Sequence, residues 1–257
     1  MAKGKNKKLS KKGKVTKRGD KHTFSKKEWF QVISPAPLEE SKPIGWTCCK
    51  KPTGTQVSSD FLKNRVAEMS LADLSHQGKD VTKRIKIQLD DIQGNACYTS
   101  FHSYELAKDK VSAIIKKRQS LIEIINELKT NDGAVFRITV YAVTIRKPGQ
   151  LKLNSYAKSS RIRILRKKVL AHLQEYASEN SSRDFIYQIV NGDVIGSTLK
   201  KVCTSVIPNS DILISKLKLI KRTVGDTGKA NEQSAAVTQT VTNTENPDAV
   251  NLLSKAQ

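Results

Sequence analysis

Six basic side chains stand close together between residues 158 and 168, in a stretch that contains no acidic residue. Such a cluster can bind a polyanion, because each Lys or Arg that neutralises a phosphate releases condensed counterions. A solvent-facing helix usually mixes Glu and Lys at i,i+4 spacing, since like charges at that spacing destabilise it. We therefore expect this segment to contact RNA through six residues: Lys158, Arg161, Arg163, Arg166, Lys167 and Lys168.

A second basic group occupies the N-terminus, where residues 1–21 carry ten basic residues and one acid, Asp20. With almost no large apolar side chains, this segment cannot bury enough surface to offset its chain entropy, and we expect it to be disordered. It could be a nuclear or nucleolar targeting signal, a solvated tail, or an RNA-binding arm. As an arm, spanning residues 1–22, it would use Lys3, Lys5, Lys7, Lys8, Lys11, Lys12, Lys14, Lys17 and Arg18.

The net charge of the whole chain also indicates a polyanionic partner. Its 257 residues include 46 Lys plus Arg and 24 Asp plus Glu, which leaves +22 with neutral histidines. The partner could be nucleic acid, an anionic membrane surface or an acidic protein. Nucleic acid fits best because basic residues occur in the tail and the core alike. No stretch approaches the roughly 18 consecutive apolar residues of a membrane-spanning helix, so we expect no membrane partner.

Other kinds of chemistry find little support in the sequence. The four cysteines have no CxxC spacing, and the four histidines form no HxxxH or HExxH pattern, so we expect no metal site. With no secretory signal, the cysteines indicate a reducing compartment, and Cys97 and Cys203 should be buried as small apolar residues. No nucleophile has an identifiable base, and no cofactor loop is present. We expect neither a catalytic site nor a cofactor.

Aromatic side chains could hold unpaired bases by stacking. Four candidates are Trp29, Phe30, Trp46 and Tyr156. Because aromatic residues make up only 5% of the chain, most should be needed for the core. We favour burial for these four, with RNA recognition through backbone and shape instead.

The first half of the folded part has the pattern of β-strands. Residues 83–90 alternate apolar and polar side chains, and residues 134–146 are rich in β-branched and aromatic types. Asn131-Asp132-Gly133 before the second run predicts a hairpin turn. Residues 121–128 fit a strand or a helix equally well. Further strands are expected at 29–33, 44–50 and 65–71, and a helix at 104–118.

The second half is predicted to be helical until its last segment. Residues 155–177 place Ile162, Leu165, Val169, Leu173 and Tyr176 at spacings of three or four, which marks one apolar face. Shorter helices are expected at 183–190 and 194–205, and a closing strand at 211–222 that could pair back with the first half. The chain is thus predicted as an α+β protein with a core over 23–222, β-rich from 23 to 150 and helical plus one strand from 151 to 222. Residues 223–257 should form a disordered polar tail.

Several sequence blocks, in order, resemble one known family. They include GKNKKLSKKGK near the start, FSKKEWFQVISP, SSDFLKNRVAEMSLADL, KTNDGAVFRIT, SYAKSSRIRILRKKV and DILISKLKLIKR. These blocks are similar to the eukaryotic small-subunit ribosomal proteins called eS-one, or S-three-a, over residues 1–222. Arg118 stands where that family leads us to expect Trp.

The resemblance implies a fold, a location and partners. It implies a β-barrel-like sheet core with attached helices, located on the platform of the small subunit near the mRNA exit. The implied partners are small-subunit rRNA and neighbouring ribosomal proteins, with translation initiation factors as a further candidate. The implied location is the cytoplasmic ribosome, with nucleolar transit during assembly. The alternative to a ribosomal role, judged from the residues alone, is a free nucleic-acid-binding regulator such as an RNA chaperone or a chromatin protein.

Overall fold

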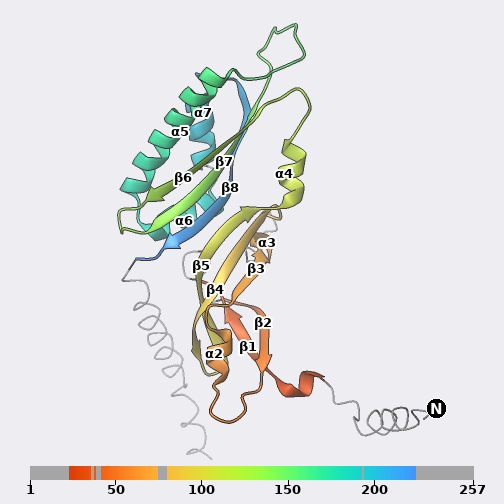
Figure 1. The fold of residues 1–257 in the computed structure, drawn as a ribbon, viewed down its shortest axis with the longest axis vertical. Helices are drawn as coiled ribbons and strands as arrows, with labels where there is room; N and C mark the ends of the chain where they lie inside the picture. Colours follow the sequence, from red (N-terminus) through yellow and green to blue (C-terminus); the bar gives the residue numbers. More distant parts are fainter. Residues whose placement is uncertain (1–22, 36–37, 39–41, 75–79, 193, 224–257) are drawn as a thin grey trace, which may run out of the picture.

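The computed structural model of the chain describes residues 23–35, 38, 42–74, 80–192 and 194–223. Nearly all of both predicted tails, 1–22 and 223–257, therefore lies outside the described residues. Within them, eight strands and six α-helices build an elongated mixed α/β fold (Figure 1). No helix in this part of the chain is both long and apolar enough to cross a membrane.

One mixed sheet contains the eight described strands. Its longest path runs β2-β1-β5-β8-β7-β6, while β4 lies off this path, pairs with β5 and carries β3 on its other edge. Pairing is antiparallel except between β1 and β5. The strands are Lys27–Ile33 (β1), Pro43–Lys50 (β2), Val66–Ser70 (β3), Lys83–Gln93 (β4), Ala96–Leu106 (β5), Leu121–Lys129 (β6), Val135–Thr144 (β7) and Asn209–Lys221 (β8).

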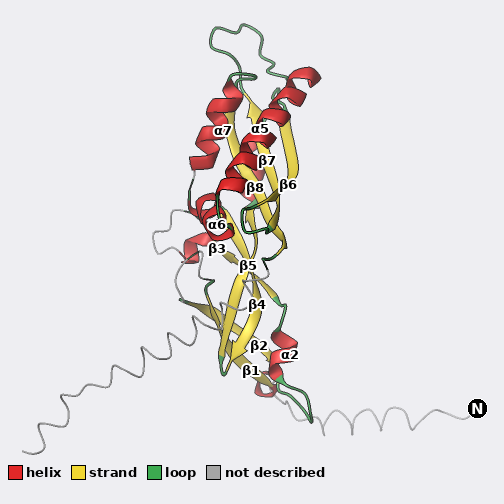
Figure 2. Ribbon diagram, turned by 90° about the vertical axis from the view of Figure 1, so that its left-hand side faces the viewer, coloured by secondary structure: helices red, strands yellow, loops and turns green. Residues whose placement is uncertain are grey.

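The strand β5 connects two halves of the molecule. Near its start, residues 96–98 pair with β1, and near its end, residues 103–105 pair with β8. One half contains β1–β4 with the short helices Ser58–Leu62 (α2) and Leu71–Leu74 (α3). The other contains β6–β8 with Ser159–Glu179 (α5), Ser182–Asn191 (α6) and Val194–Thr204 (α7), which cover one face of those strands (Figure 2).

The expected barrel-like closure is wrong, although the mixture of helices and sheet is as predicted. The sheet path ends at β2 and β6, which do not pair with each other. β5 passes from one half into the other instead of turning back on itself (Figure 1). Helices rather than a second wall of strands cover the face of β6–β8, so an open sheet can bury its apolar side chains without closing.

Sequence periodicity predicted most strands correctly. Ile85, Ile87 and Leu89 are fully buried along β4, as their alternation required. The ambiguous segment 121–128 is a strand, because it pairs along its whole length with β7 and buries alternate residues. The turn between β6 and β7 places Gly133 at φ +81°, in the left-handed region that glycine adopts without strain.

The helix predicted over 104–118 is wrong at both ends. Tyr104 and Leu106 are buried in β5, where Tyr104 pairs with Ile85 of β4 and Leu217 of β8. Only Lys108–Ile114 (α4) is helical, and none of its residues is buried. The apolar side chains at this point fit a helical stripe and a strand equally well, and pairing on both edges of β5 decides for the strand.

The remaining helices and the last strand agree with the predictions to within a few residues at their ends. The predicted apolar face of 155–177 is the buried face of α5, where Leu165, Val169 and Leu173 join the main core with Phe136 and Phe185. As predicted, the last strand returns to the first half, since β8 lies between β5 and β7.

Candidate nucleic-acid interface

The helix α5 presents its predicted basic residues to solvent. Because Leu165, Val169 and Leu173 hold one side of the helix in the core, the remaining sides face outward. Arg163 and Lys167 are one helical turn apart and both exposed. The same exposure holds for each of the six predicted residues: Lys158, Arg161, Arg163, Arg166, Lys167 and Lys168.

These cations are not neutralised within the fold. Lys168 Nζ donates a hydrogen bond to Ser205 Oγ at 3.2 Å, which leaves its charge uncompensated. No carboxylate among the described residues forms an ion pair with any of the six. The first turn of α5 contains no acidic residue either, although acids are favoured at that position. The helix therefore carries positive charge that the described fold leaves available to a partner.

Two further basic segments meet at the start of α5. The loop that precedes the helix is tied to the segment after α4 by Ser155, whose backbone N and Oγ both donate to the Arg118 carbonyl at 2.9 and 3.0 Å. Ala157 N donates to Ser120 Oγ at 3.2 Å, and Thr144 Oγ1 donates to the Ser155 carbonyl at 2.7 Å. These bonds bring the two loops together beside the helix N-terminus, at the end of the molecule seen at the top of Figure 1.

The loops extend the basic surface of α5. Their exposed cations, which the sequence interpretation did not select, are Lys116, Lys117, Arg118, Arg146, Lys147 and Lys152. We call these six residues together with the six of α5 the basic pole. One sequence signal could have revealed it, because no Asp or Glu occurs between Asp109 and Glu123 or between Asp132 and Glu175. The two acid-free stretches are the segments that the fold brings together.

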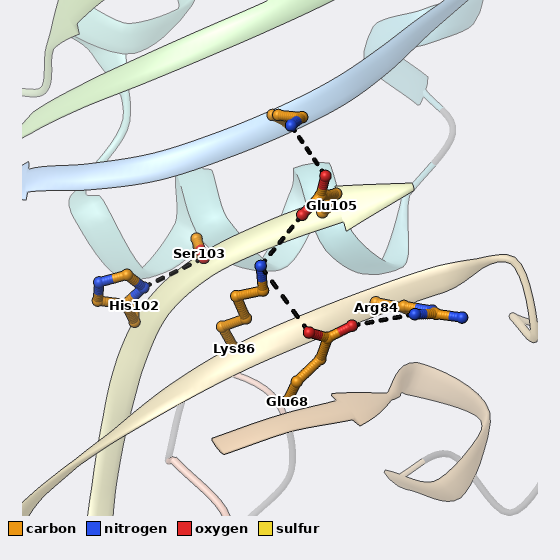
Figure 3. A network of polar contacts seen from close by, with 7 residues as sticks. Glu68, Arg84, Lys86, His102, Ser103 and Glu105 are labelled. Carbon is orange, nitrogen blue, oxygen red and sulfur yellow. Dashed lines mark hydrogen bonds and ion pairs between the residues drawn. The ribbon is translucent and has the colours of Figure 1, made fainter. Parts of the chain in front are cut away.

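Basic residues on the middle of the sheet have a different environment (Figure 3). Glu105 accepts hydrogen bonds from Lys216 at 2.9 Å and Lys86 at 3.2 Å, and Glu68 accepts one from Arg84 at 3.1 Å. The hydrogen bond from Lys216, and after it that from Lys86, holds the pKa of Glu105 below its usual value against an opposing effect of burial. These cations are compensated internally, which distinguishes them from the basic pole.

The basic pole is suited to backbone recognition. It offers Arg and Lys head groups for phosphate oxygens, and Arg can contact a phosphate through two N–H groups at once. Its twelve exposed side chains are all Lys or Arg, which donate hydrogen bonds and accept none. Such a surface positions nucleic acid through its backbone and shape rather than its sequence.

The preference for burying the four aromatic candidates is correct for one of them. Phe30 is buried in a small second core with Cys49, Leu62, Leu89 and Cys97. The other three are exposed: Trp29 and Trp46 on the β1–β2 hairpin and Tyr156 at the basic pole. The aromatic content of the chain could not distinguish buried from exposed rings. Exposure depends on position in the fold: β2 lies at a sheet edge and residue 156 lies in a loop.

The cysteines behave as apolar residues. Cys97 and Cys203 are fully buried, as predicted, and burial raises the pKa of the Cys203 thiol to about 11. Burial likewise raises the pKa values of Cys49 and Cys97. The four are free thiols, and the described residues contain no cluster of three or more His, Cys, Asp or Glu arranged to hold a metal.

The predicted residues of the N-terminal arm cannot be placed against this surface. They lie outside the described residues, which begin at Thr23. Their contact with RNA stays a prediction. These arm residues are Lys3, Lys5, Lys7, Lys8, Lys11, Lys12, Lys14, Lys17 and Arg18.

Comparison with known proteins gives a consistent result. The model of the ribosomal S3Ae family matches residues 15–223. A protein of Babesia bovis named small ribosomal subunit protein eS1 is 36% identical over 259 residues, covering 99% of this chain and 97% of its own length. Proteins of the same name from Theileria annulata and Brugia malayi are each 36% identical, covering 90% and 92% of this chain and 88% and 90% of their own.

Proposed function

The chain belongs to the ribosomal S3Ae family, and from that premise we propose that it is a structural constituent of the small ribosomal subunit. Its partners would be ribosomal RNA and other ribosomal proteins. The role is structural and not enzymatic. Nothing in the comparisons favours the alternative of a free nucleic-acid-binding regulator.

One observation carries the RNA-binding part of this proposal: twelve cations of the basic pole have no ion-pair partner among the described residues. A protein that kept such a surface in water would have to bear its self-repulsion. Ribosomal RNA removes that cost, because its phosphates lie at high density and the released counterions drive binding. The compensated cations of the sheet need no such partner.

Finer features of the role are also part of the proposal. By its resemblance to the family, the chain would occupy the platform near the mRNA exit, where translation initiation factors are further candidate partners. It would be cytoplasmic in the assembled ribosome and pass through the nucleolus during assembly. The basic residues before Thr23 would extend the RNA contact as an arm.

Sedimentation of cell lysate through a sucrose gradient tests the central proposal. We expect the tagged full-length chain to move with the free small subunit and to remain there after a high-salt wash. Release to the top of the gradient by salt would identify a peripheral RNA binder and contradict a structural role.

Deletion of residues 1–21 tests the arm separately. If the arm contacts rRNA, the truncated chain should enter subunits less efficiently than the full chain when both are expressed together. Equal incorporation would contradict the role of the arm and leave that of the basic pole unaffected, because the deletion removes no residue of the pole.

A further inference from the structure

The hairpin formed by β1 and β2 has two different faces. Its register pairs Lys27 with Lys50, Trp29 with Cys48 and Gln31 with Trp46. Since side chains alternate along a strand, these six residues share one face. The opposite face carries Phe30 and Cys49, which are buried in the second core.

The shared face, which we call the tryptophan face, is open to solvent. Trp29 is 46% exposed and Trp46 is 60% exposed, and they are the two tryptophans of the chain. Phe24, also exposed, stacks on Trp29 with ring centroids 6.2 Å apart and planes inclined by 22°. No α-helix of the described residues lies over this hairpin face, which meets only the short 3-10 helix Thr23–Lys26 through Phe24, and β2 is an edge of the sheet (Figure 1).

Charge on the tryptophan face is of one sign. Lys27 and Lys50 are directly opposite each other across the two strands, an arrangement of like charges that destabilises a sheet. Lys27 Nζ lies 5.4 Å from the Phe24 ring centroid, and Lys50 is exposed. Glu28 belongs to the other face, where it accepts a hydrogen bond from Ser58 at 2.6 Å. The face therefore combines flat aromatic surface with cations and no acid.

We propose that the tryptophan face is a second RNA site, which holds unpaired bases by stacking on Trp29 and Trp46 while Lys27 and Lys50 contact the adjoining phosphates. Open sheet faces with exposed aromatic rings suit this purpose, because every base has a planar face and the contact needs no particular sequence. A neutral apolar protein surface would cover the rings equally well but would leave the opposed lysines unrelieved.

This site differs in chemistry from the basic pole. The pole offers charge to a phosphate backbone, whether paired or unpaired, whereas the tryptophan face requires bases that are free of pairing. The inference depends on the proposed function only in taking RNA as the ligand. The two sites lie in different halves of the molecule and can be tested with separate substitutions (Figure 1).

Intrinsic fluorescence provides the test, since both tryptophans of the chain lie on this face. The full-length chain is titrated with a short oligouridine, and tryptophan emission is followed together with the anisotropy of a labelled oligouridine. We expect saturable quenching, with the same midpoint as the anisotropy. An RNA hairpin of equal charge should bind but quench far less, because its bases are already stacked.

Substitutions assign the effect to the rings. Trp46→Ala should weaken binding of oligouridine by roughly 5- to 150-fold, the loss typical of one base–aromatic stack. Trp46→Tyr should restore most of the affinity. Ile125→Ala is the matched control, because Ile125 is 59% exposed on another edge strand, β6, and lies far from this face. Melting temperature and far-UV circular dichroism establish that each variant is folded.

Each of the following outcomes would overturn the inference. One is wild-type oligouridine affinity in Trp46→Ala, and another is equal quenching by the RNA hairpin. A third is emission that responds to RNA-free small-subunit proteins but not to oligouridine, which would assign the face to a protein neighbour. Binding of oligouridine without any quenching would refute this site while sparing the proposed function. Failure to bind either RNA would refute both.

Discussion

Removing three charges from α5 should weaken RNA binding without weakening the fold. The triple variant Arg163→Gln, Arg166→Gln and Lys167→Gln changes exposed side chains that form no ion pair among the described residues. Gln has nearly the helix propensity of Arg and Lys. Arg163 and Lys167 are also like charges at i,i+4, so their removal should stabilise α5 by about 0.2–0.5 kcal/mol.

The effect on binding follows from counterion release. If each of the three side chains neutralises one phosphate, the slope of log K against log salt concentration should become shallower by about 2 to 3. At about 0.15 M salt, each lost contact corresponds to roughly a fivefold loss of affinity, or on the order of 100-fold for three. The magnitude is largest at low salt and shrinks as salt rises.

Filter binding to small-subunit rRNA across a range of salt concentrations measures both quantities. A matched control removes the same three charges from exposed residues whose partners are carboxylates: Arg84→Gln, Arg137→Gln and Lys200→Gln, which pair with Glu68, Glu127 and Asp211. Both variants have the same net charge. Equal slopes in the two variants would refute the basic pole and indicate binding by net charge alone.

Three other predictions concern the fold. Leu165→Ala should lower the free energy of unfolding by about 2–5 kcal/mol in urea titration, because Leu165 is fully buried beneath the basic face. The lowered pKa of Glu105 stabilises the fold above the ordinary glutamate value of 4.5, and this contribution is lost as pH falls below it. Glu105→Gln should therefore flatten the stability–pH curve in that acidic range, and an unchanged curve would contradict the Lys216 contact. In native protein, iodoacetamide should label half-buried Cys48 before Cys203, whose thiol is fully buried with a pKa of about 11; labelling at equal rates would contradict that burial.

Local periodicity was sufficient for most elements. The alternation in 83–90 and the three-to-four spacing of Leu165, Val169 and Leu173 each select one local structure, because the buried face of a strand or helix repeats with its own period. The same spacing identified the solvent side of α5, and with it six residues of the basic pole. Segments whose apolar residues fit both the helix period and the strand period were assigned wrongly, as at Tyr104 and Leu106, or were not assigned to either structure.

The other six residues of the basic pole depended on tertiary contacts. Lys116 and Arg146 are thirty positions apart in sequence, and the hydrogen bonds of Ser155 and Ala157 bring their loops together. Acid-free sequence marks each segment as unneutralised, but it does not contain the distance between them. The distance between the two loops depends on where β7 ends beside β6 and on where α5 begins.

The sequence by itself determined the charge, the family resemblance and most local structure, because these depend on residue types and near neighbours. The tertiary structure decided that the sheet stays open and that Trp29 and Trp46 face solvent. Their strands alternate as a half-buried hairpin should, and alternation cannot say which face a neighbouring layer will cover. In this fold the face of Phe30 packs into the second core, and no described α-helix lies over the face of the tryptophans.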